Sequence, residues 1–170
     1  MPLYEVNGKR PAIGTGCWIA PNASVIGDVH IGADCYVGFG AVIRADFGSI
    51  EIGDKSVVED NVVIHAACRT CIGNGVIVAH QAMIHDAEIG DNVLIGMQTL
   101  IGDQVIIEAD AIVAEQSHVR KQTTVAAGSI VGGRPAVHIG FTTPGHRQAI
   151  LDGSRAYADL RGAYRICPEN

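Results

Sequence analysis

Three of the seven histidines, His65, His80 and His85, have the residue type and the close spacing of a candidate metal site. Imidazole nitrogen is a common ligand of Zn²⁺, and Fe²⁺ or Co²⁺ can occupy the same ligands. A zinc ion held by three neutral imidazoles keeps a fourth position open, and a water bound there has its pKa lowered to about 7. The predicted chemistry is therefore attack by hydroxide at neutral pH, provided that the fold brings the three rings together.

The fold that must position these histidines is set by a six-residue repeat. From Ile19 onward an aliphatic residue recurs every six positions, as in VIGDVH, IGADCY and IGNGVI. An α-helix repeats its apolar face every three or four residues and a strand every two, so neither period fits. A hexapeptide period is typical of a parallel β-helix, in which three units close one triangular coil. We therefore expect residues 19–137 to form an all-β solenoid of about six coils, with inward aliphatic side chains stacked on one another.

The repeat allows the histidines to be compared in space. The units that begin at Ile64 and Ile84 are three units apart, so His65 and His85 should lie on the same side of successive coils. Each follows an inward aliphatic residue and should point outward, with about 5 Å between their Cβ atoms, which suits two ligands of one metal. His80 lies on a different side. We therefore expect a site between subunits of an obligate homotrimer, in which His80 of one subunit meets the histidine pair of the next.

Charged residues fall in the same register. Arg44 should lie one coil before His65 on the same side, and Asp46 is two residues further along the chain. Glu59 falls one coil before His80, on the side of that histidine. The predicted seam between subunits thus collects an arginine, two carboxylates and three imidazoles.

Two stretches and the C-terminal segment depart from the repeat. Residues 46–51 and 67–71 interrupt the hexads, and extra residues in a solenoid are extruded as loops, often on the binding side. Beyond the repeat, Thr143 and Pro144 provide an N-cap and a first-turn proline for a helix over 144–165. An apolar stripe on this helix should pack along the solenoid; it comprises Ile150, Leu151, Tyr157, Leu160 and Tyr164.

Length and composition limit the class of protein. The 170 residues suit a single domain over 1–170, divided into an N-terminal segment (1–18), the β-helix (19–137) and the C-terminal helix (144–165). The net charge of −6 and the lack of a basic run argue against binding to nucleic acid or to an anionic membrane. No apolar stretch approaches a membrane span, and the N-terminus lacks the apolar region of a signal peptide, so we expect a cytoplasmic protein.

The five cysteines are odd in number and irregularly spaced, which is not typical of a secreted disulfide framework. We expect most of them to be thiols. Cys68 and Cys71 form a CxxC beside the predicted site, where a redox pair or a second metal site are the functional alternatives. Because a lone CxxC is a weak signal, plain cysteines at the corner of a coil are favoured.

The sequence around the three histidines resembles that of the γ-class carbonic anhydrases. The resemblance covers nearly the whole chain and rests on IRADFG, VVEDNVVIH and VAHQAMIH, followed by IGDNVLIGM. It implies a trimeric, left-handed β-helix with a C-terminal helix. It also implies that His65, His80 and His85 are the metal ligands and that Arg44 and Asp46 form an ion pair between subunits. The implied reaction is the reversible hydration of CO₂ to bicarbonate by a metal-bound hydroxide.

Four positions depart from the family pattern. Glu59 stands where the family commonly has Gln beside the metal-bound water, and Val57 where archetypal members have Asn. Phe47 and Cys68 stand approximately where the most active members have proton-shuttle acids. Glu59 is therefore the candidate for orienting the nucleophile or accepting its proton. Members of the family can also place a tyrosine from the C-terminal region near the metal.

Three other functions share this scaffold. Some proteins similar to this one hydrolyse acyl-CoA thioesters with the same metal-bound hydroxide, and a loop at 67–71 would give such a substrate room. Hexapeptide acyltransferases typically use a single histidine as base and no metal, so three histidines in ligand register count against that class. Other relatives are structural subunits of larger assemblies, and a catalytically weak or structural trimer is the remaining alternative.

Overall fold

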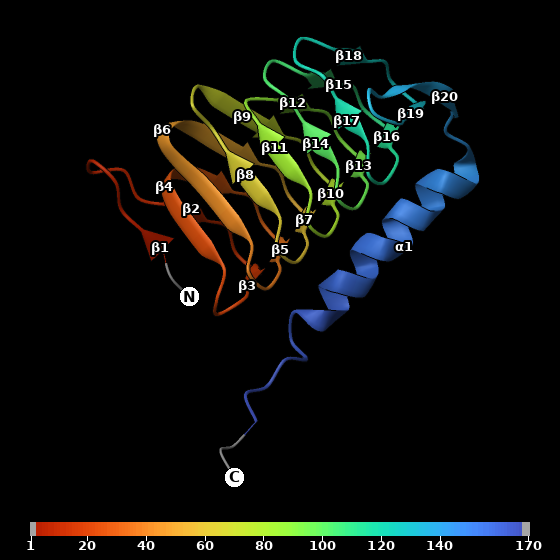
Figure 1. The fold of residues 1–170 in the computed structure, drawn as a ribbon. Coiled ribbons are helices and arrows are strands. Elements are labelled where there is room, and N and C mark those ends of the chain that lie inside the picture. Colours follow the sequence, from red (N-terminus) through yellow and green to blue (C-terminus); the bar gives the residue numbers. More distant parts are fainter. Residues whose placement is uncertain (1–2, 168–170) are drawn as a thin grey trace.

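Short parallel strands wind into a left-handed β-helix that occupies most of the chain, followed by one helix (Figure 1). The computed structural model describes residues 3–167. The strands are β1 (Leu3–Tyr4), β2 (Ala12–Ile13), β3 (Trp18–Ile19), β4 (Ser24–Ile31), β5 (Tyr36–Val37), β6 (Val42–Ile52), β7 (Val57–Val58), β8 (Val63–His65), β9 (Arg69–Ile72), β10 (Ile77–Val78), β11 (Met83–His85), β12 (Glu88–Ile89), β13 (Leu94–Ile95), β14 (Leu100–Ile101), β15 (Ile106–Ile107), β16 (Ile112–Val113), β17 (His118–Val119), β18 (Thr124–Val125), β19 (Ser129–Gly132) and β20 (Val137–Phe141).

The strands form three faces of a prism. One sheet has the order β20-β19-β16-β13-β10-β7-β5-β3, and we call it the helix face because α1 (Pro144–Leu160) packs on it. The start of β6 with β8, β11, β14 and β17 forms the histidine face, and the end of β6 with β9, β12, β15 and β18 forms the third face. In the helix face only β20 is antiparallel, so seven parallel strands mark about seven turns. The sequence predicts about six coils over residues 19–137, one fewer than the number of parallel strands in this sheet.

The predicted ladder of inward aliphatic residues is confirmed. On the histidine face, successive coils pair in register from β4 to β17. The inward aliphatic side chain of each strand in this series is at most 1% exposed. These residues are Val25, Ile43, Ile64, Ile84, Ile101 and Val119. Burial of one such side chain contributes roughly 1.5–3 kcal/mol, so the stack stabilises every coil that takes part in it.

Polar side chains close the corner between the third face and the helix face. The Oδ1 atoms of Asp54, Asn74 and Asp91 accept hydrogen bonds from the backbone N–H groups of Ala33, Asp54 and Asn74, at 2.7–2.9 Å. Each side chain thus satisfies a donor in the coil before it. Gly53 lies at this corner because a Cβ atom there would come within 2.6 Å of the backbone of the next coil.

The two predicted loops are largely strand, so that expectation is wrong. Residues 46–51 lie inside β6, which pairs with β8 at its start and with β9 at its end. Residues 69–72 form β9, and only residues 67–68 bend away from regular structure. The extra residues lengthen two coils rather than leaving them, because continuous pairing satisfies the backbone groups that a loop would expose.

The helix begins where the sequence predicts and ends earlier. Thr143 is the N-cap and Pro144 opens α1, but the helix stops at Leu160 rather than near residue 165. The Thr143 side chain accepts from the His146 N–H, and the His146 ring accepts from the Thr143 N–H, a reciprocal cap that the sequence analysis missed. Within residues 3–167, no helix is long and apolar enough to cross a membrane.

Polar contacts hold α1 along the whole helix face. Near the start of α1, Arg147 Nε lies 3.8 Å from Asp110 Oδ2. Just after the end of α1, Arg161 Nη1 lies 2.9 Å from Asp34 Oδ1. Between them, Ile150 is buried against the strands. Figure 1 shows the helix running from the β20 end of the solenoid back towards β3.

Two members of the predicted apolar stripe do not pack as expected. Leu151 and Leu160 are exposed, because the helix contacts the solenoid along a narrower strip than the pattern indicates. Tyr164 lies beyond the helix and stacks on Trp18 with ring centroids 4.5 Å apart.

The inward aliphatic side chains should stabilise the fold more than the outward ones do, and denaturation can measure the difference. Ile101 is 0% exposed between two neighbouring coils, so Ile101→Ala should lower the free energy of unfolding by about 2–5 kcal/mol. Ile106 on the third face is 43% exposed, and Ile106→Ala should lower it by less than about 1 kcal/mol. Urea denaturation at one fixed protein concentration gives both values. Equal losses in the two variants would contradict the inward and outward assignment.

Candidate metal site

Two of the three predicted ligands lie side by side on the histidine face. His65 ends β8 and His85 ends β11, and the two residues are direct partners across the parallel pair. Their ring centroids are 5.0 Å apart and the ring planes are inclined by 61°. The repeat register places them in this way because each follows an inward isoleucine. Both side chains are partly buried, at 15% and 26% exposure.

Carboxylates lie at both ends of this histidine pair. Asp46 Oδ1 is 3.0 Å from His65 Nε2, and the same carboxylate forms an ion pair with Arg44 of its own chain. Burial acts to raise the pKa of Asp46, but the hydrogen bonds to His65 and Arg44 outweigh it and lower the pKa. At the other end, Asp103 Oδ1 is 2.7 Å from His85 Nδ1. The ion pair between subunits that the resemblance implies for Arg44 and Asp46 stays a prediction.

His80 lies away from the pair, at the corner between the helix face and the histidine face. Its Nε2 atom is 3.1 Å from Glu59 Oε2, and its Nδ1 accepts a hydrogen bond from the Asp60 backbone N–H at 3.2 Å. Glu59 is only 7% exposed, and its Oε2 also accepts the His80 backbone N–H at 3.0 Å. The structure thus places Glu59 beside His80, as the register predicts.

A tyrosine from α1 joins this cluster. The Tyr157 hydroxyl is 3.4 Å from His80 Nε2, whereas Tyr164 packs on Trp18 and Tyr36. Burial, and then the nearby Glu59 carboxylate, raise the pKa of Tyr157, so its hydroxyl keeps its proton. Tyr157 is therefore the tyrosine that reaches a predicted ligand.

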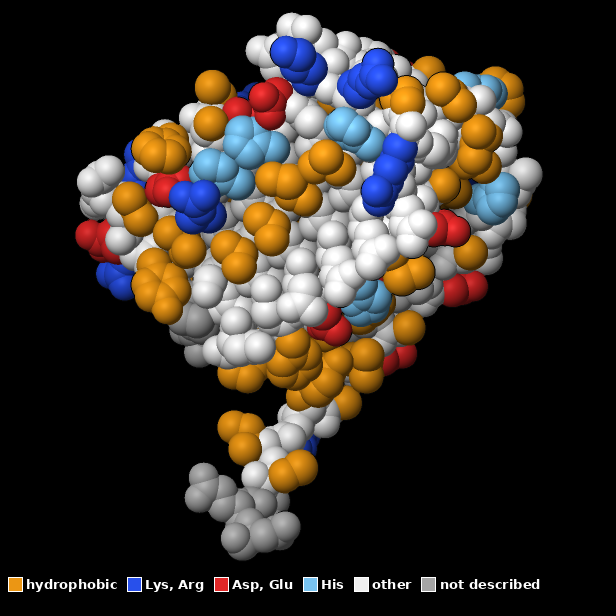
Figure 2. Space-filling view, in the orientation of Figure 1, with side chains coloured by type: hydrophobic (Ala, Val, Ile, Leu, Met, Phe, Trp, Pro, Cys, Tyr) orange, Lys and Arg blue, Asp and Glu red, His pale blue; other side chains and the backbone are white. Residues whose placement is uncertain are grey.

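The three imidazoles do not meet within one chain. Across residues 3–167, no three His, Cys, Asp or Glu side chains are grouped so as to hold a metal ion. Figure 2 shows the histidine side chains in separate places on this side of the molecule, with one pair beside acidic and basic groups. The imidazole donors fit zinc in type, and His65 and His85 fit it in spacing. His80 completes such a set only across two copies of the chain.

The positions that depart from the family pattern have different surroundings. Phe47 is 76% exposed, and its ring centroid lies 6.3 Å from that of His65, so it puts an apolar group beside the pair. Val57 is buried under α1 with Tyr36 and Ile77. Cys68 is exposed near Asp86, whose Oδ1 accepts its backbone N–H at 2.9 Å.

Cys68 and Cys71 lie at the start of β9: Cys68 is in the bend before the strand, and Cys71 is within it. Both are free thiols, as the favoured interpretation predicts.

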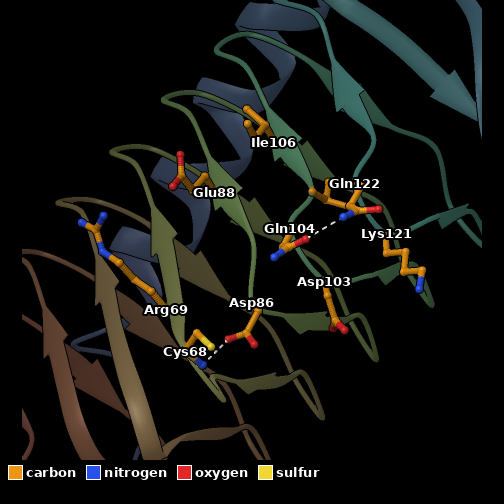
Figure 3. A pocket seen from close by; sticks show the side chains of 10 residues that line it. Cys68, Arg69, Asp86, Glu88, Asp103, Gln104, Ile106, Lys121 and Gln122 are labelled. Carbon is orange, nitrogen blue, oxygen red and sulfur yellow. Dashed lines mark hydrogen bonds between the residues drawn. The ribbon is translucent and has the colours of Figure 1, made fainter.

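A surface pocket of about 490 Å³ adjoins the histidine pair (Figure 3). It lies at the corner between the histidine face and the third face, and its lining includes Asp86, Asp103, Glu88 and Lys121. Asp103 is the residue that the sequence analysis missed. The register of β11 and β14 places Gly102 opposite His85, so a register argument alone does not reach Asp103, one residue further along the chain.

The comparisons with known proteins agree with this fold. The family described as bacterial transferase hexapeptide (six repeats) matches residues 10–45. A solved structure, a hexapeptide transferase family protein from Anaplasma phagocytophilum, superposes with a TM-score of 0.92 at 29% identity, covering 96% of this chain and 98% of that one. The chain belongs to the hexapeptide-repeat family.

Within that family, the chain is similar to proteins named gamma carbonic anhydrase. It is 32% identical to gamma carbonic anhydrase 1, mitochondrial, of Arabidopsis thaliana and 39% identical to gamma carbonic anhydrase 3, mitochondrial, of the same plant. Each match covers 95% of this chain. The chain spans 62% and 66% of the lengths of those two relatives.

The thiols should differ sharply in reactivity. Burial raises the pKa of Cys35 to about 12, so at pH 8 this thiol stays protonated as well as shielded. Cys68 is exposed. Iodoacetamide at pH 8 should therefore alkylate Cys68 and leave Cys35 unmodified until the protein unfolds, as peptide mass mapping can show. Equal labelling of the two in the folded protein would contradict the buried position of Cys35.

Proposed function

We propose that this chain is a metal-dependent carbonic anhydrase of the γ class, which hydrates CO₂ reversibly to bicarbonate. The observation that carries the proposal is the pairing of His65 with His85, whose rings are 5.0 Å apart on adjacent coils. A hexapeptide coil needs no outward imidazole for its stability, and two of them at ligand spacing have a chemical use. The similarity to gamma carbonic anhydrases over 95% of the chain supports the same activity.

The site requires a homotrimer, because His80 and the histidine pair lie at different corners of the prism. Exposed apolar side chains on the histidine face support such an assembly: Val63, Met83 and Leu100 are 37–38% exposed on three adjacent strands. Figure 2 shows apolar side chains spread over this side of the molecule. Packing three such faces around a threefold axis would cover them and bring His80 of one subunit to the pair of the next.

The ion is proposed to be Zn²⁺, with Fe²⁺ or Co²⁺ as alternatives that suit the same nitrogen ligands. Bound by three imidazoles, it supplies an activated water at neutral pH. Asp46 and Asp103 hold the rings of His65 and His85 by hydrogen bonds. Glu59, beside His80 and Tyr157, is the base that orients the nucleophile or receives its proton. Cytoplasmic location and the absence of nucleic-acid and membrane partners stay predictions.

Hydrolysis of an acyl-CoA thioester is the second candidate function. Phe47 favours it, because an exposed phenyl ring beside His65 offers an acyl chain an apolar contact that CO₂ does not need. A trimer that binds metal without turnover would instead be structural.

Stopped-flow measurement of CO₂ hydration tests the proposal. Reduced protein reconstituted with zinc should accelerate hydration well above the His85→Ala protein, because that variant lacks one of the paired ligands. The wild-type protein should also sediment as a trimer.

Two results would contradict parts of this proposal. A protein that holds zinc but shows no rate above the His85→Ala blank is not a carbonic anhydrase, and a panel of CoA thioesters then tests the second candidate. A monomer that is fully active would contradict the shared site.

The role of Glu59 predicts a separate kinetic effect. Glu59→Gln keeps the shape of the side chain but removes the basic carboxylate, so the turnover number should fall by roughly 100-fold. The pH–rate profile should change with it, and zinc content should not. An unchanged turnover number and pH profile would show that Glu59 is not the base.

A further inference from the structure

A column of side chains runs up the histidine face and ends at Asp103. Arg44, His65 and His85 are register partners on three successive strands, and Asp46 bonds to His65 from the lower end. At the upper end, Asp103 Oδ1 lies 2.7 Å from His85 Nδ1. This is a short hydrogen bond, and it fixes which nitrogen of His85 is engaged.

The register explains why a carboxylate can reach His85 from above. Leu100 and Ile101 pair with Met83 and Ile84, and continuing this register by one residue places Gly102 opposite His85. Since glycine has no side chain, the space above the ring is left to the following residue. Asp103 fills this space, and its carboxylate makes a hydrogen bond to His85.

A second carboxylate near His85 does not serve the same purpose. Asp86 Oδ2 is 3.7 Å from His85 Nδ1, too far for a hydrogen bond, and Asp86 Oδ1 accepts the backbone N–H of Cys68. Figure 3 shows Asp86 and Asp103 on adjacent coils of one corner, with Cys68 bonded to Asp86. Asp86 therefore stabilises the backbone of the corner through Cys68, and Asp103 is the one of these two carboxylates that is placed to hold the His85 ring.

We propose that Asp103 is a positioning residue for His85: its carboxylate accepts the Nδ1–H and leaves Nε2 as the ligand atom. This inference rests on the proposed metal site. A carboxylate on the outer nitrogen sets both the tautomer and the orientation of a liganding imidazole and increases its basicity. His65 differs, because its Nε2 is the atom that faces a carboxylate in the metal-free chain. Asp103 thus fixes the tautomer and orientation of His85 before a metal ion binds.

Zinc affinity, measured by competition with a chromophoric chelator, tests the proposal without reference to activity. Asp103→Ala and Asp103→Asn should weaken zinc binding by roughly 10- to 100-fold. The matched control is Glu88→Gln, which removes one negative charge from the same pocket without touching a histidine (Figure 3). It should change the affinity by less than about twofold, since exposed charges are screened. Thermal unfolding of all three variants should match the wild type.

The tautomer of His85 gives a second readout in metal-free protein. Nitrogen-15 NMR at a pH where the ring is neutral should find the proton of His85 on Nδ1 in the wild type, and Asp103→Ala should abolish that preference. Wild-type His85 protonated mainly on Nε2 would overturn the proposal. So would an Asp103→Ala protein that binds zinc within twofold of the wild type.

The failure of this inference can be told apart from that of the proposed function. A protein that binds zinc through His85 and does not hydrate CO₂ contradicts the carbonic anhydrase assignment, whereas the affinity of Asp103→Ala still decides the role of Asp103. Zinc binding that survives His85→Ala would remove the metal site, and this inference with it.

Discussion

Parallel pairing between coils, locked by the inward aliphatic stack, fixes where every outward side chain of this protein stands. Because Ile64 and Ile84 are buried one above the other, the residues that follow them are neighbours on the surface. The 5.0 Å between the rings of His65 and His85 is therefore a property of the strand spacing rather than of any local interaction. A site built in this way is held by the whole solenoid.

The same constraint arranges charge along the histidine face. From bottom to top the side chains are the Arg44 cation, the Asp46 anion, two imidazoles and the Asp103 anion, each within reach of the next. A carboxylate lies at each end of the histidine pair, so the pair is held by hydrogen bonds from both ends. By contrast, His80 and Glu59 form a separate cluster beside α1, where the Tyr157 hydroxyl approaches His80.

The hexad pattern predicted the solenoid, the stacking of His65 on His85 and the approach of Glu59 to His80, because those features depend on register alone. It failed where coils change length: residues 46–51 were expected to leave the coil, and backbone pairing keeps them in β6. The end of α1 was misplaced because apolar periodicity continues to Tyr164, whose ring packs on Trp18 without helical backbone. The proposed meeting of His80 with the pair would take place between subunits, and the register of one chain does not describe such an assembly.

Helix α1, which spans the helix face of the solenoid, should affect how the protein unfolds. Each coil of a repeat protein touches only its neighbours, so such arrays lose their terminal repeats one after another. Here α1 joins Asp110, late in the array, to Asp34, near its beginning. Unfolding of coils at either end therefore also removes a contact with α1, and we expect this helix to make the unfolding of the coils more cooperative.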